Sequence, residues 1–483
     1  MKVLFAVSEC SPFVKSGGLA DVAGSLPKEL QRLGTEIRVI LPKYWEIDEI
    51  YKQKMKKVKE FTVPVGWRNQ YCGIEELQHQ GITYYFVDNE YYFKRPGLYG
   101  YFDDGERFAY FTRAVLESLS QLDFYPDIIH CHDWHTAMIP YLLRVEYQSR
   151  KRYGFIRTVF TIHNLQFQGI YPKEILGDVL GLDSKFFNPW HIEFFGNVNF
   201  LKGAIVAADK ITTVSPTYKQ EIQTPAYGEK LDGLLRTREE DLFGILNGID
   251  NGVYNPENDP LIAQVYSSTD FRLKGVNKQE IQRRFSLPER ARTPLMVMIS
   301  RLTKQKGLDL VQRVLHEILE EDIQFVVLGS GDHQYEQFLN YAAGTFSENF
   351  RVYLGFNETL AHQLYAAADL FLMPSLFEPC GLGQMIAMKY GAVPIVRETG
   401  GLNDTVTAWN EFTGEGNGFS FRDFNAHDML YTIRRALHFY RDREAWPRIV
   451  ESAMKMDNSW ARSAFQYNQL YLVLASRSET HVF

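Results

Sequence analysis

The stretch from Val3 to Leu33 constrains the fold more than any other part of the chain. The apolar run Val3–Val7 is typical of a buried parallel strand, and Lys15-Ser16-Gly17-Gly18 follows it. Helical spacing then links the apolar residues Leu19, Ala23, Leu26, Leu30 and Leu33. Two glycines let the backbone approach a ligand, free N–H groups at a helix start favour an anion, and Lys15 adds a mobile charge. We therefore expect a strand–loop–helix unit that holds a phosphate, with a tight turn and a solvated lysine as the alternative.

Strands and helices alternate through the rest of the chain. At 483 residues the chain is too long for one core. The segment 247–260 (NGIDNGVYNPENDP) is rich in turn formers and is the best linker. Repeated βα units on both sides of it predict two doubly wound α/β domains with parallel sheets. The expected strands are 3–7, 36–41, 127–131, 158–162 and 211–214 before the linker, and 294–299, 323–328, 350–354, 370–373 and 393–396 after it; 61–88 is β-rich and 460–476 helical.

Charge and cysteine content narrow the class of protein. The net charge of −7 argues against nucleic acid or an anionic membrane as a partner. The four cysteines lie far apart without zinc spacing, which indicates reduced thiols in a cytoplasm. The chain starts at a strand, so no signal peptide is expected, and no apolar stretch approaches the roughly 18 residues that span a bilayer. With no Asp-x-Asp pair and no clustered His or Cys, we expect no metal-bound diphosphate.

Unusual residues fall just after the expected strands. Ligands of open α/β sheets bind beyond the carboxyl ends of the strands. Two such edges that faced each other would form one interdomain cleft. The residues at these positions are Lys15, Asp133, His163, Arg301, Gly329, Phe356, Glu378 and Gly400.

Their chemistry suits a phosphate and a sugar. Arg301 and Lys306 could hold a pyrophosphate with Lys15, or be solvated loop cations. Glu378 could face a sugar hydroxyl or a developing cation, or cap the helix that follows. The N–H groups after Glu378, with Gly400 and the next glycine, could complete a phosphate cradle.

Three further residues allow two interpretations each. His163 could position a substrate hydroxyl or be structural. Asp133 and Trp134 offer a carboxylate beside a stacking face, or a core tryptophan. Cys380 lacks an evident base and is interpreted as packing, and Asp103-Asp104 is interpreted as a turn.

Several motifs in order resemble bacterial glycogen synthases and plant starch synthases. They are KSGGLADVAGSLPKEL, HCHDWHTAM, TIHNLQFQGIYP, NGID, SRLTKQKGLDL, LGSGD, EPCGLGQMIAMKYG and TGGLNDTV. The resemblance implies two facing Rossmann-like domains with a cleft (the GT-B architecture). It places 1–246 with 460–483 on the acceptor side, the last helix crossing back, and 247–459 on the donor side. It also implies a cytoplasmic hexosyltransferase that moves glucose from ADP-glucose to the non-reducing end of an α-1,4-glucan, glycogen, with retention and without cofactor or metal.

The resemblance also assigns roles to residues. Lys15, Arg301 and Lys306 would meet the donor diphosphate, Glu378 would face the transferred glucose and His163 would hold its hydroxyls. Phe356, where relatives often carry Tyr, would lie against the adenine, and Gly383 stands where several relatives have a larger residue. The donor site would also include Gly18, Gly329, Leu382, Gly383 and Gly400, and the glucose and acceptor region Tyr99, Asp133, Trp134, Asn164 and Asn247.

Three rival interpretations remain. Another GT-B enzyme, such as one that uses UDP-glucose or makes sucrose or trehalose phosphate, would keep the second-domain motif, but KSGGL with EPCGL speaks against it. A pyridoxal-dependent glucan phosphorylase would need its cofactor lysine and usually a longer chain. An inactive glucan-binding scaffold would not need the full set of cations with Glu378.

Overall fold

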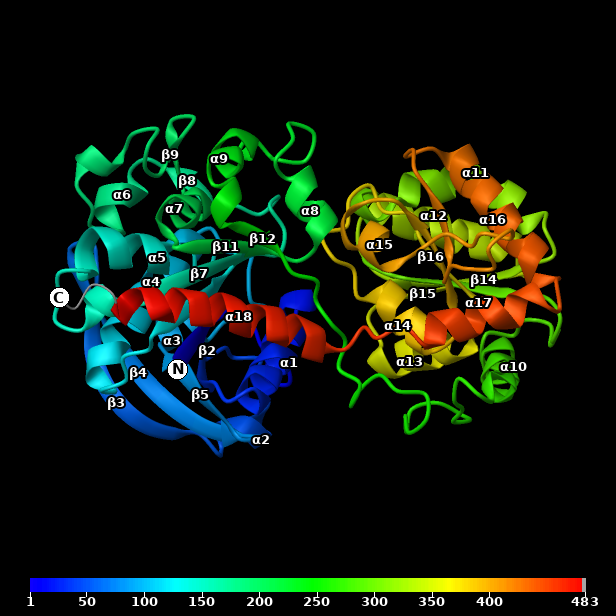
Figure 1. The fold of residues 1–483 in the computed structure, drawn as a ribbon, viewed down its shortest axis with the longest axis horizontal. Coiled ribbons are helices and arrows are strands. Elements are labelled where there is room, and N and C mark those ends of the chain that lie inside the picture. Colours follow the sequence, from blue (N-terminus) through cyan, green and yellow to red (C-terminus); the bar gives the residue numbers. More distant parts are fainter. Residues whose placement is uncertain (480–483) are drawn as a thin grey trace. The chain divides into compact units, whose positions relative to one another are not determined.

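The computed structural model describes residues 1–479 and divides into two compact units, shown in Figure 1. Unit 1 comprises Met1–Asn247 and Trp460–Phe483, and unit 2 comprises Gly248–Ser459. The chain therefore enters unit 2 after Asn247 and leaves it before Trp460. These boundaries lie within one residue of those expected from the sequence.

Unit 1 is built on a nine-stranded sheet in the order β12-β11-β7-β6-β1-β2-β5-β4-β3. Neighbours from β12 to β5 pair in parallel, whereas β4 pairs antiparallel with both β5 and β3. A small antiparallel sheet, β8-β10-β9, is added beside it. The strands are β1 Lys2–Ala6, β2 Glu36–Pro42, β3 Lys56–Val65, β4 Arg68–His79, β5 Ile82–Asp88, β6 Ile128–His132, β7 Arg157–Ile162, β8 Ile170–Pro172, β9 Glu193–Phe194, β10 Asn197–Asn199, β11 Lys210–Thr213 and β12 Leu242–Gly244.

The last helix, α18 (Trp460–Glu479), belongs to unit 1 and packs on α1. Its Tyr471 hydroxyl lies 2.6 Å from Nδ1 of the buried His130 in β6, and its Ser463 hydroxyl donates to the Leu246 carbonyl. The helix expected over 460–476 is confirmed. The other helices of unit 1 are α1 Gly18–Arg32, α2 Glu49–Lys52, α3 Glu90–Phe93, α4 Asp104–Gln121, α5 Met138–Leu142, α6 Ile175–Asp178, α7 Phe200–Ala207, α8 Pro216–Glu221 and α9 Asp232–Thr237.

Unit 2 is built on a six-stranded, wholly parallel sheet in the order β15-β14-β13-β16-β17-β18. Helices α11, α12 and α16 cover one face, and α10, α13 and α14 cover the other (Figure 1). The strands are β13 Leu295–Ile299, β14 Gln324–Gly329, β15 Phe350–Leu354, β16 Leu370–Met373, β17 Val393–Arg397 and β18 Phe419–Phe421. The helices are α10 Lys274–Arg284, α11 Leu308–Leu319, α12 His333–Thr345, α13 Glu358–Ala367, α14 Gly383–Lys389, α15 Gly400–Thr405, α16 Ala426–Tyr440 and α17 Ala445–Met454.

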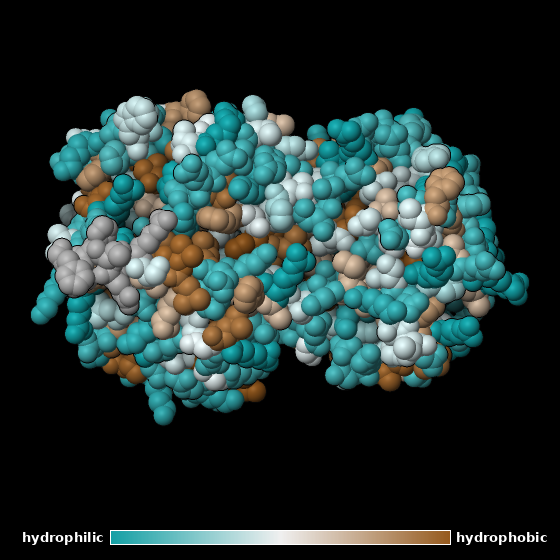
Figure 2. All heavy atoms as spheres, viewed as in Figure 1, coloured by the Kyte–Doolittle hydropathy of each residue, from teal (hydrophilic) through white to brown (hydrophobic). Residues whose placement is uncertain are grey.

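Burial explains why these segments form strands and helices. The β16 strand (LFLM) is buried at every position, as expected for a strand covered by helices on both faces. On α11, Leu308, Val311, Leu315 and Ile318 form one buried stripe at helical spacing. Outward-facing positions are mainly hydrophilic, as Figure 2 shows for the visible face. The doubly wound α/β class expected from the sequence is confirmed for both units.

Candidate active site

A buried carboxylate holds the KSGG loop of unit 1. Glu9, 2% exposed, lies between β1 and the loop, and its Oε2 accepts the Ser16 N–H at 2.8 Å and the Ser16 hydroxyl. Its Oε1 accepts the Ala20 N–H at 3.3 Å, inside the first turn of α1, whose N-cap Gly17 offers no side-chain cap. Burial raises the pKa of Glu9 above its ordinary value. Sequence reasoning missed this residue, and the only available signal was a charged side chain at the end of an apolar run.

Lys15 and Gly18 lie together at the start of α1, as predicted. The Lys15 Nζ is 2.7 Å from Oδ1 of Asp21, and the two side chains are 31% and 27% exposed. This contact uses one of the three N–H donors of the ammonium. Two N–H donors of Lys15 are therefore not used by its contact with Asp21, which lies in the first turn of α1.

Asp133 joins two loops at the carboxyl edge of the unit 1 sheet. It follows β6 with a left-handed backbone (φ 55°), and its Oδ1 accepts the N–H groups of His163 at 2.8 Å and Asn164 at 3.4 Å. Burial raises the pKa of Asp133 to about 7. The structure therefore brings these three predicted residues together, and it uses the carboxylate to position the backbone after β7.

His163 is paired with a second histidine. Its Nε2 lies 2.9 Å from Nδ1 of His132, the last residue of β6. Burial lowers the pKa of His163 to about 3, and that of His132 well below its usual value. His163 is consequently uncharged at neutral pH, and its Nδ1 is left to exchange a hydrogen bond with a neutral group such as a hydroxyl.

Tyr99 and Trp134 occupy the same edge but differ in access. The Tyr99 hydroxyl lies 2.8 Å from the Ser8 hydroxyl, and its ring stacks on His135 at a centroid distance of 4.4 Å. Trp134 is only 8% exposed and packs edge-on against Phe108 at 5.2 Å. The neighbouring rings cover much of the indole, which favours the alternative of a core tryptophan, and its place in the glucose and acceptor region stays a prediction.

The structure also shows the burial of Asn247 and the contacts of the Asp103-Asp104 pair. Asn247 is 7% exposed, and its Oδ1 has no hydrogen-bond partner among residues 1–479, so a buried acceptor is left available. The interpretation of Asp103-Asp104 as a turn holds for Asp103 but not for Asp104. Asp104 begins α4 and pairs at 2.5 Å with the fully buried Arg107 one turn later, while Asp103 pairs with Arg95 at 2.6 Å.

In unit 2 the centre of the predicted site is an ion pair. The Lys306 Nζ lies 2.6 Å from Oε2 of Glu378, and the side chains are 15% and 8% exposed. The Ser375 hydroxyl donates to the same carboxylate oxygen at 3.0 Å. The next helix, α14, has no side-chain cap, so the alternative of Glu378 as its cap is excluded. Lys306 and Glu378 lie on different loops, after β13 and β16, and this contact joins them.

Arg301 and Phe356 are the exposed members of this edge. Arg301 follows β13, and its side chain makes no ion pair or hydrogen bond with any other described residue. Phe356, after β15, is 77% exposed and offers a free ring face. Gly329 ends β14, and a Cβ there would lie 1.9 Å from the Ser300 carbonyl oxygen. Only glycine allows the loops after β13 and β14 to approach so closely.

The loop from Glu378 to Gly383 is held against the start of α15. At Gly400, with φ +45°, a Cβ would lie 1.9 Å from the Glu378 carbonyl oxygen, so no larger residue fits. Leu382 and Gly383 open α14, where a Cβ on Gly383 would already lie 3.2 Å from the Phe371 ring. Cys380 is 5% exposed, so its interpretation as a packing residue is confirmed.

Neither a metal-binding cluster nor a membrane-spanning helix is found among residues 1–479. No group of three or more His, Cys, Asp or Glu side chains in that range is arranged to hold a metal ion. Within the same residues, no helix has both the length and the apolar character needed to cross a membrane.

Family models match both units of the chain. The model described as "Starch synthase catalytic domain" matches residues 2–237, and "Glycosyl transferases group 1" matches residues 279–452. The catalytic domain of starch synthase IV from Arabidopsis thaliana, solved with ADP and acarbose, is similar at TM-score 0.92 and 37% identity over 99% of both chains. A sucrose-phosphate synthase from Thermosynechococcus elongatus, 16% identical with TM-score 0.63, shares the fold alone. Fold and matches together define a GT-B glycosyltransferase, and hence an enzyme.

Relatives across the full length narrow this class. The chain is 63% identical to a glycogen synthase of Anoxybacillus flavithermus over 482 residues, 100% of both chains. It is 64% identical to one of Geobacillus stearothermophilus over 479 residues, 99% of both. The chain belongs to the glycogen and starch synthase family, so the resemblance identified from its motifs is confirmed.

Proposed function

We propose that the chain extends an α-1,4-glucan by transferring glucose from ADP-glucose to the 4-hydroxyl at its non-reducing end, with retention of configuration. The observation that carries the proposal is the Lys306–Glu378 pair beside the unpaired Arg301, at the carboxyl edge of a parallel sheet. That edge is where open α/β sheets bind ligands. Full-length identity to glycogen synthases supports the same substrate class.

The proposed chemistry follows from where charge develops. The transition state resembles an oxocarbenium ion that separates from a departing ADP, so negative charge grows on the diphosphate. Arg301 grips a phosphate through its fork of donors, and the Lys306 N–H groups not used by Glu378 add a point charge. Each well-placed donor contributes about 3 kcal/mol to such a transition state. Glu378 orients Lys306 and lies beside the glucose as its positive charge develops.

Retention requires either a carboxylate nucleophile or attack on the same face as departure. A nucleophile would belong to a pair of carboxylates about 5 Å apart. The described contacts of Glu378 are with Lys306 and Ser375, and no second carboxylate is among them. We favour same-face attack, in which the leaving phosphate assists deprotonation of the acceptor hydroxyl.

The residues of unit 1 are proposed to serve glucose and acceptor. Neutral His163 suits a hydroxyl, and the Tyr99 and Asn247 side chains offer further polar atoms. The expectation that Lys15 meets the same diphosphate as Arg301 stays a prediction from the sequence. We further propose a cytoplasmic enzyme that needs neither metal nor cofactor.

The test is incubation with ADP-glucose or UDP-glucose, each with and without glycogen, and measurement of nucleotide release. Release that needs both ADP-glucose and glycogen is the expected result. Faster nucleotide release from UDP-glucose would show that UDP-glucose, and not ADP-glucose, is the donor. Glycogen binding without nucleotide release from either donor would indicate an inactive glucan-binding scaffold. The Glu378→Gln variant is the matched control, because it keeps the side-chain volume and removes the charge.

A further inference from the structure

A cavity of about 520 Å³ lies in unit 2 at the amino ends of the strands, the edge of the sheet opposite to Arg301 and Glu378. Asp369, which lines it, directly precedes β16, and Arg292 lies three residues before β13. The volume falls within the range of about 300–1,000 Å³ typical of small-molecule sites. This cavity is thus separated from the proposed donor edge by the length of the strands.

The cavity is strongly basic although the chain carries a net charge of −7. Two acidic side chains, Asp369 and Asp442, line it. Four of the basic ones are exposed arginines, and among residues 1–479 none of these four has an ion pair or a side-chain hydrogen bond. The basic residues of the lining are Arg272, Lys274, Lys278, Arg292, Arg441 and Arg443.

The two acids are already engaged. The Asp369 Oδ2 accepts from the Lys278 Nζ at 2.7 Å and from the Leu295 N–H at 2.8 Å. The Asp442 Oδ1 accepts two backbone N–H groups at the start of α17, at 2.9 and 3.0 Å. Neither carboxylate therefore neutralises an arginine of the cavity.

The two lysines are engaged as well. The Lys274 Nζ donates to three backbone carbonyls at 2.7 to 3.0 Å, and burial lowers its pKa to about 7. Lys278 is held by Asp369. The charge left for a ligand is consequently that of the guanidinium groups.

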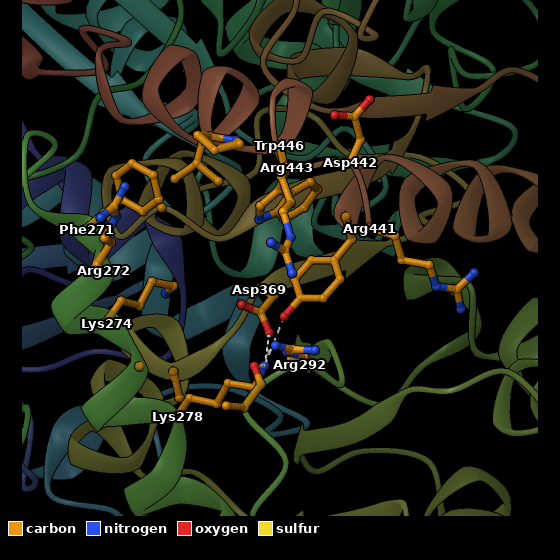
Figure 3. A pocket seen from close by; sticks show the side chains of 17 residues that line it. Phe271, Arg272, Lys274, Lys278, Arg292, Asp369, Arg441, Asp442, Arg443 and Trp446 are labelled. Atoms are coloured by element: carbon orange, nitrogen blue, oxygen red, sulfur yellow. Dashed lines mark hydrogen bonds and ion pairs between the residues drawn. The ribbon is translucent and has the colours of Figure 1, made fainter.

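Figure 3 shows how these side chains are arranged. Arg443 and Arg292 reach toward the middle of the pocket near Asp369, while Arg441 and Asp442 point away from it. Aromatic rings line the same space: Phe271 lies on one side and Trp446 on another, edge-on to Tyr440 at 5.1 Å. Guanidinium groups without a protein partner beside aromatic rings have the chemistry that suits an anion with a ring.

We propose that this pocket binds a small organic phosphate, with Arg292 and Arg443 on the phosphate and Trp446 against the body of the ligand. Guanidinium groups bind phosphate through paired N–H donors, and an indole offers a large, flat apolar face. The cavity volume of about 520 Å³ suits a small molecule rather than an acidic peptide. Two sources share this chemistry, a sugar phosphate and a nucleoside monophosphate.

Calorimetric titration of the full chain tests the proposal, with a hexose phosphate, adenosine monophosphate and inorganic phosphate as separate probes. The pocket variant is Arg292→Ala with Arg443→Ala. The matched control is Arg290→Ala, an exposed arginine two residues from Arg292 that does not line the pocket. Arg301→Ala reports on binding at the donor edge instead.

We expect at least one organic phosphate to bind, with affinity about tenfold or more lower in the pocket variant and within about twofold in Arg290→Ala and Arg301→Ala. Trp446→Leu should remove the preference over inorganic phosphate. Binding of the hexose phosphate alone, or of the nucleotide alone, identifies the source. The proposal is overturned if no probe binds, if the loss appears in Arg301→Ala instead, or if inorganic phosphate binds as tightly as both organic probes.

Discussion

Breaking the Lys306–Glu378 pair should cost stability and activity in different ways. Lys306→Met leaves the Glu378 carboxylate, 8% exposed, with only the Ser375 hydroxyl as a partner. Removing one partner of a buried ion pair costs about 3–5 kcal/mol, and because Lys306 is 15% exposed we expect a value near about 3. For a domain of this size that corresponds to a melting temperature about 6–12 °C lower.

A double-mutant cycle measures the stability that the interaction between Lys306 and Glu378 contributes, separately from the cost of each single substitution. Glu378→Gln keeps a contact to Ser375 and should cost about 1–3 kcal/mol. The double variant Lys306→Met, Glu378→Gln has no unpaired charge, so its cost should be smaller than the sum of the single costs by about 1.5–3 kcal/mol. Scanning calorimetry measures this on the transition of unit 2, because the two units need not unfold together.

The turnover of the double variant should stay low although its stability is higher than the two single costs would predict. If Lys306 and Glu378 act on the donor, each single variant and the double variant lose about 100-fold or more in kcat. A coupling energy near zero would show that the pair does not stabilise unit 2. Recovered turnover in the double variant would refute the catalytic reasoning and leave a purely structural pair.

Three further outcomes are expected. Lys15→Ala should raise the KM for the donor and change stability by less than about 1 kcal/mol, since its ion pair is partly exposed; an unchanged KM in steady-state kinetics would contradict its donor role. Gly400→Ala should displace the Glu378 carbonyl and lower both melting temperature and turnover, whereas Gly344→Ala, in α12 with open space around it, should lower neither. Burial lowers the pKa of His135 to about 3 from 6.5, so the unfolded state binds the extra proton between those values and stability falls as pH drops from about 6.5 toward 3. The loss in the free energy of unfolding is about 2 kcal/mol at pH 5. His135→Gln should therefore make the free energy of unfolding, measured with urea at several pH values, depend less on pH. An unchanged pH dependence would contradict the contribution of His135.

Much of the fold could be predicted because the strands are apolar runs with sharp ends. The strands expected at 350–354 and 370–373 have the observed bounds, those expected at 294–299 and 393–396 differ by one residue at one end, and that expected at 323–328 is shifted by one residue. The short strand β18 was not predicted. A strand covered on both faces is nearly all apolar, so its sequence alone marks it. The carboxyl end of such a strand marks the edge of the sheet at which open α/β sheets bind ligands. For that reason Lys306 and Glu378 could both be singled out from the sequence.

The rest depended on contacts between distant residues. That Glu9 holds the KSGG loop, and that Lys306 pairs with Glu378, follow from loop geometry that no local pattern encodes. Asp104 looked like part of a turn because its partner Arg107 is a mid-helix residue whose burial the sequence does not display. For Trp134 the sequence leaves two alternatives, because a tryptophan after a strand can face a ligand or the core, and its packing against Phe108 becomes visible only in the structure.

The most direct measurement of the central claim is the structure of the product. The chain is incubated with ADP-glucose and a short maltooligosaccharide in excess EDTA, and the extended glucan is examined by proton NMR. A new α-1,4 linkage at the non-reducing end, formed at an undiminished rate in EDTA, is the predicted result. A β linkage, release of free glucose without extension, or activity that returns only when Mg²⁺ or Mn²⁺ is added would contradict retaining, metal-independent transfer.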